Sequence, residues 1–450
     1  MTFRSLALSN IRGNWRSYGA FFMSSVFSVM IFYIYAAFLA HPEVASGRLV
    51  AAAKVRQGMV FCEYVIVIFS FLFVLYSNSA FLKTRQQEFG LFSLFGMTRA
   101  QLRKLVLYEN AAIAALSIGA GIGLGILFSK LFFMGLGVLL GMSDTIPFAI
   151  PQQAVWVTAG GFFLLFTLIS LWTTLRISRT EIADRLKASR RPKGQLVYSR
   201  WLALLAVVCL GVGYSLALTL NEAYFDLKVL LILLTVVLGT YLLFTQFSIL
   251  FLRLIRKRTG IYYNRTNMLV YAQLGYKMKD NARVLVVVSI LSAVILTASS
   301  AVYMLAVAGQ YQDLKTQYDN FREVIALTMF IGLFISLLFF IASGSMMYFK
   351  LFTELQEDRT QFKALTRIGI TLDEIRAIVV PQVGGVMFFA PCLIGIAHAL
   401  VAMKALDNLL HLSNWLYSFV VIGVYMAMQT LYFVVACRGY MKSVLRGVAS

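Results

Sequence analysis

The sequence predicts an all-α integral membrane protein with about ten transmembrane helices. Hydrophobic residues make up 60% of the 450 residues and charged residues only 13%, and the mean hydropathy is +0.80. A chain with so few polar side chains cannot cover a water-soluble globule of this length. Apolar stretches near the roughly 20 residues needed for a helix to cross a bilayer recur along the whole chain. We therefore expect lipid to be the main solvent of the chain.

Ten apolar stretches are long enough to be spans, and their limits follow from hydropathy alone. They cover residues 18–40, 59–82, 106–129, 153–174, 202–220, 227–252, 285–307, 324–348, 378–402 and 415–437. The stretch 130–141 is apolar but short, so it predicts either an extension of the third span or an interfacial helix.

Basic residues predict the orientation of these spans. The chain has 40 Lys and Arg against 19 Asp and Glu, a formal net charge of +21, and most of the basic residues lie in every second connection. These connections are the N-terminus, 83–104, 176–200, 253–283, 350–376 and the C-terminus. Because cytoplasmic loops retain Lys and Arg, both termini are predicted to be cytoplasmic. The positive charge is thus assigned to loops facing anionic lipid, and no nucleic-acid partner is expected.

A repeat links the connection after the second span with the connection after the eighth. Residues 85–102, RQQEFGLFSLFGMTRAQL, align with residues 358–375, DRTQFKALTRIGITLDEI, 273 positions later. The aligned pairs are Phe89 and Phe362, Gly96 and Gly369, Thr98 and Thr371, and Leu102 and Ile375. We name these segments the first and second corner loops, because each predicts a short helix, a left-handed glycine and a threonine that caps the next helix.

Apolar residues in the first corner loop predict a docking surface. Phe89, Leu91, Phe92, Leu94 and Phe95 give it more apolar surface than a solvated linker needs. The alternative is an amphipathic elbow that lies on the inner leaflet, although duplication favours docking of a two-fold partner. The candidate contact residues are Glu88, Phe89, Leu91, Phe92, Gly96, Thr98, Phe362, Leu365, Gly369 and Thr371.

The repeat predicts two halves. A weaker similarity between 6–18 and 268–284 supports them. The first half would be residues 1–190 with four spans, a central helix pair would occupy 200–255, and the second half would be 261–450.

Four polar residues within or near the spans are candidate intramembrane polar positions. Glu109 lies near the cytoplasmic end of the third span, where it is expected either to stay hydrated or to pair with Arg103 or Lys104. Gln382 aligns with it in the repeat. Glu63 and His398 lie near outer ends of spans, and the favoured interpretation is a water-exposed side chain for both, with lining of a lipid groove as the alternative.

Pro381 and Pro391 bracket the ninth span and predict a bend or hinge, since proline removes a backbone hydrogen bond. Glycines at 119, 121, 123 and 125 predict close helix packing.

No chemistry is predicted for this chain. The phosphate-binding pattern G-x-x-x-x-G-K-[ST] is not found in the sequence. The three histidines are scattered, and the four cysteines have no paired spacing, so no metal site is expected. The chain is therefore expected to be a non-catalytic subunit without a cofactor of its own.

The corner motif, the four-helix halves and the ten-span layout resemble FtsX-like ABC transporter permeases of the bacitracin-export branch. The strings SNIRGNWRSY at 9–18, KTRQQEFGLFSLFGMTRAQLRKLVLYEN at 83–110 and KLFTELQEDRTQFKALTRIGIT at 350–371 carry this resemblance. It implies a bacterial cytoplasmic membrane and a cytosolic ABC ATPase dimer that holds ATP and Mg and docks on the corner loops. It further implies a sensor histidine kinase and a role in resistance to antimicrobial peptides that capture lipid-linked cell-wall intermediates.

One departure from that branch is large. Its members carry a substantial extracellular domain between the seventh and eighth spans, whereas here only a short external loop at 308–323 is predicted. Two alternatives to the permease remain: an ion-coupled secondary transporter, which would need intramembrane acids, and a peptide-sensing signalling partner of a membrane kinase.

Overall fold

The computed structural model describes residues 15–45, 50–140, 147–179, 199–220, 225–263, 266–308, 312–410 and 415–449. These residues form helices and no strands, which confirms the predicted all-α class. Nine helices of the described part are long and apolar enough to cross a membrane, and a shorter apolar stretch, Ile66–Leu82, lies where the second span is predicted. The protein is a multi-pass membrane protein.

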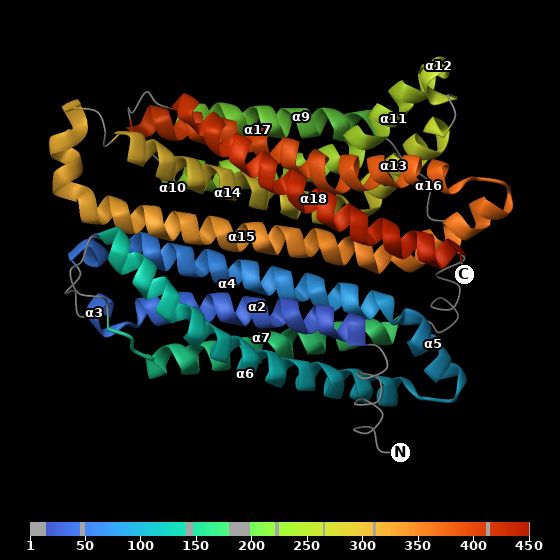
Figure 1. Ribbon diagram of the computed structural model, residues 1–450, viewed down its shortest axis with the longest axis horizontal. Coiled ribbons are helices and arrows are strands. Elements are labelled where there is room, and N and C mark those ends of the chain that lie inside the picture. Colours follow the sequence, from blue (N-terminus) through green and yellow to red (C-terminus); the bar gives the residue numbers. More distant parts are fainter. Residues whose placement is uncertain are drawn as a thin grey trace. The chain divides into compact units, whose positions relative to one another are not determined.

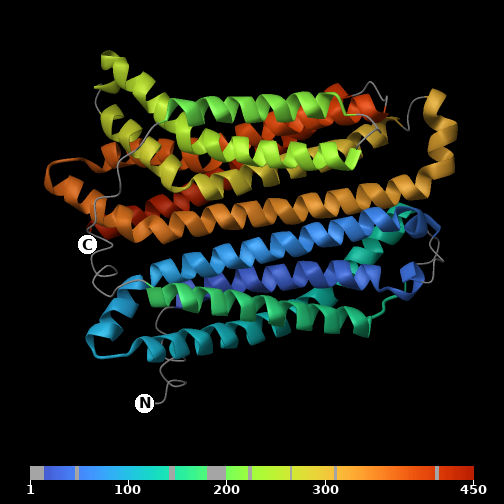
Figure 2. The same cartoon turned by 180° about the vertical axis from the view of Figure 1, so that it is seen from behind.

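Contacts divide the chain into two compact units. The first consists of residues 1–192 and 321–331, and the second of residues 193–320 and 332–450. The first unit contains α2 (Trp15–Leu39), α3 (Pro42–Ala45), α4 (Val50–Thr84), α5 (Gln86–Leu94), α6 (Arg99–Leu140) and α7 (Gln152–Arg179). Helices α2, α4, α6 and α7 lie side by side as a four-helix bundle, and α5 makes a bend between α4 and α6 (Figures 1 and 2).

Two glycines of α6 allow it to approach α2 closely. A Cβ added to Gly121 would lie 2.6 Å from the Cβ of Val29, and one added to Gly125 would lie 2.6 Å from the Tyr33 ring. A Cβ added to Gly119 or Gly123 would have no atom within 4 Å. The predicted packing role is thus confirmed for two of the four glycines. The aromatic contact between Phe38 of α2 and Phe132 of α6 continues this interface.

The second unit holds the remaining helices. These are α9 (Arg200–Leu218), α10 (Phe225–Leu242), η1 (Leu243–Phe247), α11 (Ser248–Lys257), α12 (Thr259–Tyr262), α13 (Asn267–Asp280), α14 (Ala282–Ala308), most of α15 (Gln312–Arg367), α16 (Leu372–Pro381), η2 (Gln382–Phe389), α17 (Ala390–Leu410), η3 (Trp415–Tyr417) and α18 (Ser418–Ala449). Helix α14 packs against α17 and α18, and α9 packs against α10 and α17. Both η1 and η2 are π-helical, whereas η3 is a 3-10 turn.

Two details differ from the sequence-based predictions, and a third decides between two predicted alternatives. Helix α15 begins at Gln312, so most of the predicted external loop 308–323 is helical. The second corner loop has no separate short helix, because α15 continues through Asp358 to Arg367, whereas α4 ends at Thr84 and α5 starts anew. Helix α6 continues to Leu140, so the stretch 130–141 extends the third span rather than forming an interfacial helix.

Candidate functional site: the two corner loops and their anchors

The two corner loops have the same backbone geometry. Gly96 and Gly369 have φ values of 88° and 101°, in the left-handed region that glycine tolerates best. In the first loop, Gly96 N–H donates to Ser93 O at 3.2 Å and Met97 N–H to Phe92 O at 3.1 Å. In the second loop, Gly369 N–H donates to Thr366 O at 3.0 Å and Ile370 N–H to Leu365 O at 3.2 Å.

These paired bonds define a Schellman motif, which closes a helix with a left-handed glycine. All four donors and acceptors are related by the 273-residue offset of the sequence repeat. The predicted left-handed glycines are therefore present in both loops.

Threonine then starts the next helix in both loops. Thr98 N–H donates to Gln101 Oε1 at 2.8 Å, and Gln101 N–H donates back to Thr98 Oγ1 at 3.3 Å. Thr371 N–H donates to Glu374 Oε2 at 2.9 Å, and Glu374 N–H donates to Thr371 Oγ1 at 3.3 Å. Such reciprocal capping boxes fix the direction in which a helix begins. The predicted capping threonines are thus present as well.

An exposed apolar side chain lies at the same point of each corner loop. Phe95 is 84% exposed and Ile368 is 78% exposed, and each directly precedes its left-handed glycine. Leu91 and Leu94 extend the exposed apolar surface of the first loop, and Leu372 extends that of the second. We name Phe95 and Ile368 the corner tips.

Other predicted contact residues are anchors rather than surface. Phe89 is buried in a cluster with Leu102 and Val106, against which Leu82 and Phe92 pack. Phe362, the repeat partner of Phe89, is also buried, and so are the repeat partners of Leu102 and Val106, Ile375 and Val379. The prediction that Phe89 and Phe362 lie on the docking surface is wrong, because both side chains are buried, Phe89 on α5 and Phe362 on α15. Leu365 is half-buried, while Thr98 and Thr371 are exposed.

A buried ion pair holds the first corner loop. Glu109 of α6 is fully buried, and its carboxylate accepts hydrogen bonds from both terminal nitrogens of Arg85, the residue that precedes α5. Arg85 Nε also donates to Glu88 at 2.8 Å, and the guanidinium lies 4.9 Å from the Tyr18 ring centroid and 5.0 Å from that of Phe89. The expectation of a hydrated Glu109 is therefore wrong.

Glu109 stabilises the positive charge of the buried Arg85 side chain. Burial alone would lower the pKa of Arg85, but the hydrogen bond and the negative charge of Glu109 outweigh it, and the pKa is raised. The guanidinium therefore links the end of α4, which precedes α5, to α6, which follows it. Sequence reasoning missed Arg85, although its alignment with Asp358 in the repeat marks a charged position in both corner loops.

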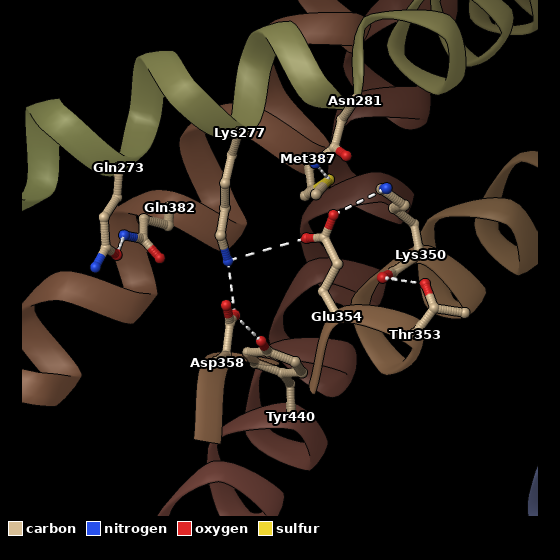
Figure 3. A network of polar contacts seen from close by, with 10 residues as sticks. All are labelled: Gln273, Lys277, Asn281, Lys350, Thr353, Glu354, Asp358, Gln382, Met387 and Tyr440. Carbon is tan, nitrogen blue, oxygen red and sulfur yellow. Dashed lines mark hydrogen bonds and ion pairs between the residues drawn. The ribbon is translucent and has the colours of Figure 1, made fainter. Parts of the chain in front are cut away.

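A larger polar network holds the second corner loop (Figure 3). Lys277 Nζ of α13 lies 2.6 Å from Asp358 Oδ2 and 4.0 Å from Glu354 Oε2, both on α15. Lys350 Nζ binds Glu354 Oε1 at 2.9 Å, and the Tyr440 hydroxyl of α18 donates to Asp358. Gln382, the repeat partner of Glu109, is buried, and its Nε2 donates to Gln273 Oε1 of α13. No pattern in the sequence marked Lys277 or Tyr440 as partners of Asp358.

The remaining predicted residues lie elsewhere. His398 of α17 is buried, with Nδ1 2.7 Å from the Tyr214 hydroxyl and Nε2 2.9 Å from Thr240 Oγ1. The water-exposed interpretation of His398 is therefore wrong, because this side of α17 faces α9 and α10. Glu63 is half-buried on α4. Pro381 and Pro391 lie on either side of π-helical η2, and their role as a hinge stays a prediction.

Comparison with known proteins finds an FtsX-like permease domain and relatives among ABC transporter permeases. Residues 61–182, which include the first corner loop, match the model of the FtsX-like permease C-terminal domain. The uncharacterized ABC transporter permease YvcS of Bacillus subtilis is 28% identical over an alignment of 645 positions, which covers 99% of this chain and 100% of YvcS. The ABC transporter permease protein YxdM of Bacillus subtilis is 40% identical over 72% of this chain and 51% of YxdM.

The bacitracin export permease protein BceB of Bacillus subtilis is 25% identical over 71% of this chain and 50% of BceB, so the chain matches about half the length of YxdM and of BceB. The alignment with YvcS is longer than the chain, so YvcS contains residues that this chain lacks. Their position between the seventh and eighth spans stays a prediction. The spans, the matched domain and these relatives agree: the chain contains an FtsX-like permease domain, and its relatives are ABC transporter permeases.

Proposed function

We propose that this permease subunit converts ATP hydrolysis by a separate cytosolic ABC ATPase dimer into helix movement, and that the dimer docks on the two corner loops. The observation that carries the proposal is the pair of corner tips, Phe95 and Ile368. They are exposed apolar side chains at equivalent positions of two loops with equivalent backbone geometry.

Symmetry of the partner explains why the loop is duplicated. An ATPase dimer with a two-fold axis presents the same surface twice, so it needs two equivalent contacts on a single-chain partner. An apolar residue that fills a pocket at the centre of a contact contributes much of the binding energy. Phe95 and Ile368 fit this role because each is held rigidly between a Schellman motif and a capping box.

The anchors support a mechanical role for the corner loops. The Arg85–Glu109 pair and the Lys277–Asp358 pair tie the loops to the spans, so a push on a corner tip reaches the helices instead of being lost in a mobile linker. ATP and Mg would be held by the partner ATPase. The corner loops would face the cytoplasm of a bacterial cell, and both termini would lie there too.

The relative named as a bacitracin export permease suggests the biological role. We propose that the complex confers resistance to cell-wall-targeting antimicrobial peptides of the bacitracin kind, acting on a peptide bound to a lipid-linked intermediate at the outer leaflet. A sensor histidine kinase would be a further partner.

The first experiment measures docking. The permease would be purified in mild detergent with its native ATPase, and the ATPase recovered per permease would be compared for wild type, Phe95→Glu, Ile368→Glu and the double variant. We expect at least a tenfold loss in the double variant. Tyr263→Glu is the matched control, because Tyr263 is 65% exposed in another predicted cytoplasmic segment, and it should retain the ATPase.

If the loops were instead elbows bound to lipid, the double variant would recover as much ATPase as wild type. Undiminished recovery of ATPase by the double variant would overturn the docking proposal. Bacitracin susceptibility of cells that carry the same variants tests the biological role separately, and susceptibility equal to that of a permease deletion is expected for the double variant.

A further inference from the structure

The two corner loops are anchored in different ways at equivalent positions. In the first unit, Arg85, the first residue of the loop, pairs directly with Glu109, which follows the loop. The equivalent residues of the second unit are Asp358 and Gln382. Asp358 bonds to Lys277, and Gln382 bonds to Gln273. Both flanks of the second corner loop are therefore bound by one helix, α13.

One face of α13 makes these bonds. Gln273 and Lys277 are four residues apart, so they lie on the same side of the helix. Asn281, four residues further on, continues this side, and its Nδ2 lies 3.8 Å from Met387 Sδ in η2. Figure 3 shows the three side chains, two from α13 and that of Asn281 directly after its end, pointing toward α15 and η2.

Charge makes the contact of α13 with α15 specific. The Lys277 side chain is 15% exposed, and those of Asp358 and Glu354 are 6% and 9% exposed. Separating α13 from α15 would leave these buried charges without a counterion, which is costly. The ion pairs therefore hold the two helices together. Helix α18 joins them, because Tyr440 bonds to Asp358 and Ser443 O accepts from Arg359 Nε at 2.9 Å.

Helix α13 also packs against both π-helical segments of the second unit, η1 and η2. Segment η1 continues α10 of the central helix pair, and η2 precedes α17. Short π-helical segments interrupt the hydrogen-bond register of an α-helix, and they are frequent at functional sites. Helix α13 thus lies against the second corner loop, against η2, which continues from α16, and against η1 of the central helix pair.

We propose that α13 is a transmission helix, which carries movement of the second corner loop to η1 and η2, with Lys277 and Gln273 as its positioning residues. The first corner loop, by contrast, acts directly on α6 through Arg85 and Glu109. The two corner loops are therefore unequal: equal inputs from a symmetric ATPase reach different helices. This inference rests on the proposed docking of an ATPase at the corner loops and adds the path that the movement takes.

The test is hydrogen–deuterium exchange of the permease–ATPase complex in nanodiscs, with and without ATP and vanadate. In wild type, we expect ATP-dependent differences at both corner loops, at the start of α6, and at η1 and η2. In Lys277→Met with Asp358→Asn, which removes both charges and so leaves none unpaired, the differences at η1 and η2 should be lost. The differences at both corner loops and at α6 should remain.

The matched control is Arg376→Met with Asp373→Asn. This pair lies 2.8 Å apart on α16, the helix that begins in the same corner loop, and both side chains are exposed. It removes the same charges without removing a polar bond made by α13, so the differences at η1 and η2 should persist. A reciprocal control, Arg85→Met with Glu109→Gln, should lose the difference at α6 and keep those at η1 and η2.

Two results would overturn the inference in distinguishable ways. If the corner loops respond to ATP and η1 and η2 still respond in Lys277→Met with Asp358→Asn, α13 is not the path, while the proposed function stands. If neither corner loop of wild type responds, the proposed function fails and the inference fails with it. Should that double variant not fold, Gln273→Leu with Gln382→Leu interrupts the other contact of α13 without any change of charge.

Discussion

Phe95 and Ile368 occupy the same position in two loops that are 273 residues apart, and each is among the more exposed large hydrophobic residues of the protein. Each directly precedes a glycine with a positive φ. A repeat kept only for packing would bury these side chains, as it buries Phe89 and Phe362. The division of each corner loop into a buried anchor and an exposed tip is what a loop needs in order to receive force from a partner and pass it to the spans.

Replacing Gly96 or Gly369 by valine should uncouple the ATPase. Neither glycine has an atom within 4 Å of an added Cβ, so the cost comes from the backbone, about 1–2 kcal/mol for a left-handed residue with a side chain. The loop would change direction and displace its tip. We expect the variants to insert normally but to lose bacitracin resistance, measured as growth inhibition. Gly160→Val is the control, because its Cβ also meets open space but lies within α7; equal effects at 96 and 160 would contradict the role of the turn.

Replacing Glu109 by glutamine should destabilise the first unit. Arg85 would keep a buried charge without its main counterion, and breaking such a pair costs about 3–5 kcal/mol. Thermal unfolding of the purified permease, followed by tryptophan fluorescence, measures the loss. Glu88→Gln removes the other carboxylate on Arg85, but that side chain is 35% exposed, so its effect should stay below about 1 kcal/mol. A melting temperature lowered equally by both variants would argue against Glu109 as the anchor.

The spans and the corner turns could be predicted because their signals are local. Twenty apolar residues predict a span wherever they occur, and a glycine followed two residues later by threonine specifies a helix end and a helix start. The structure has Gly96, Thr98, Gly369 and Thr371 in these conformations. The repeat strengthened this prediction, because the same glycine and threonine recur 273 residues later.

The partners of buried polar residues could not be predicted because they depend on how helices rotate and pack. Glu109 pairs with a residue 24 positions away, and Asp358 with one 81 positions away. His398 is surrounded by apolar residues in the sequence, and hydropathy does not reveal whether its side of α17 faces lipid or another helix. The same uncertainty about helix rotation misplaced Phe89 and Phe362 on the surface.

Enlarging Gly125 should separate α2 from α6. A side chain there would meet the Tyr33 ring at 2.6 Å, a distance that real Cβ atoms do not adopt. Overpacking of this kind costs about 1–3 kcal/mol, so Gly125→Val should lower the melting temperature of the purified permease. Gly123→Val, two residues away with open space around its Cβ, is the control and should melt like wild type. If both variants melt alike, the close approach of the two helices is not what holds the bundle.

Replacing His398 by leucine should loosen the central helix pair. Tyr214 on α9 and Thr240 on α10 both bond to its ring nitrogens. Thr240 would keep its bond to Val236 O, but the Tyr214 hydroxyl would lose its partner, and an unsatisfied polar group costs about 1–3 kcal/mol. The melting temperature should fall for His398→Leu and recover in the triple variant His398→Leu, Tyr214→Phe, Thr240→Val, which removes all three polar groups together. No recovery in the triple variant would mean that the size of the histidine, rather than its hydrogen bonds, matters.

Labelling of single cysteines should place the corner tips in the cytoplasm. The four native cysteines would first be replaced by alanine, and Ile368→Cys and Phe148→Cys would then be introduced separately. Both positions are exposed, at 78% and 46%, and they lie in connections of opposite predicted sides. Because basic loops stay inside, a membrane-impermeant maleimide should label position 148 in intact cells but position 368 only after permeabilisation. The reverse pattern would put the corner tips outside the cell, where no ATPase could reach them.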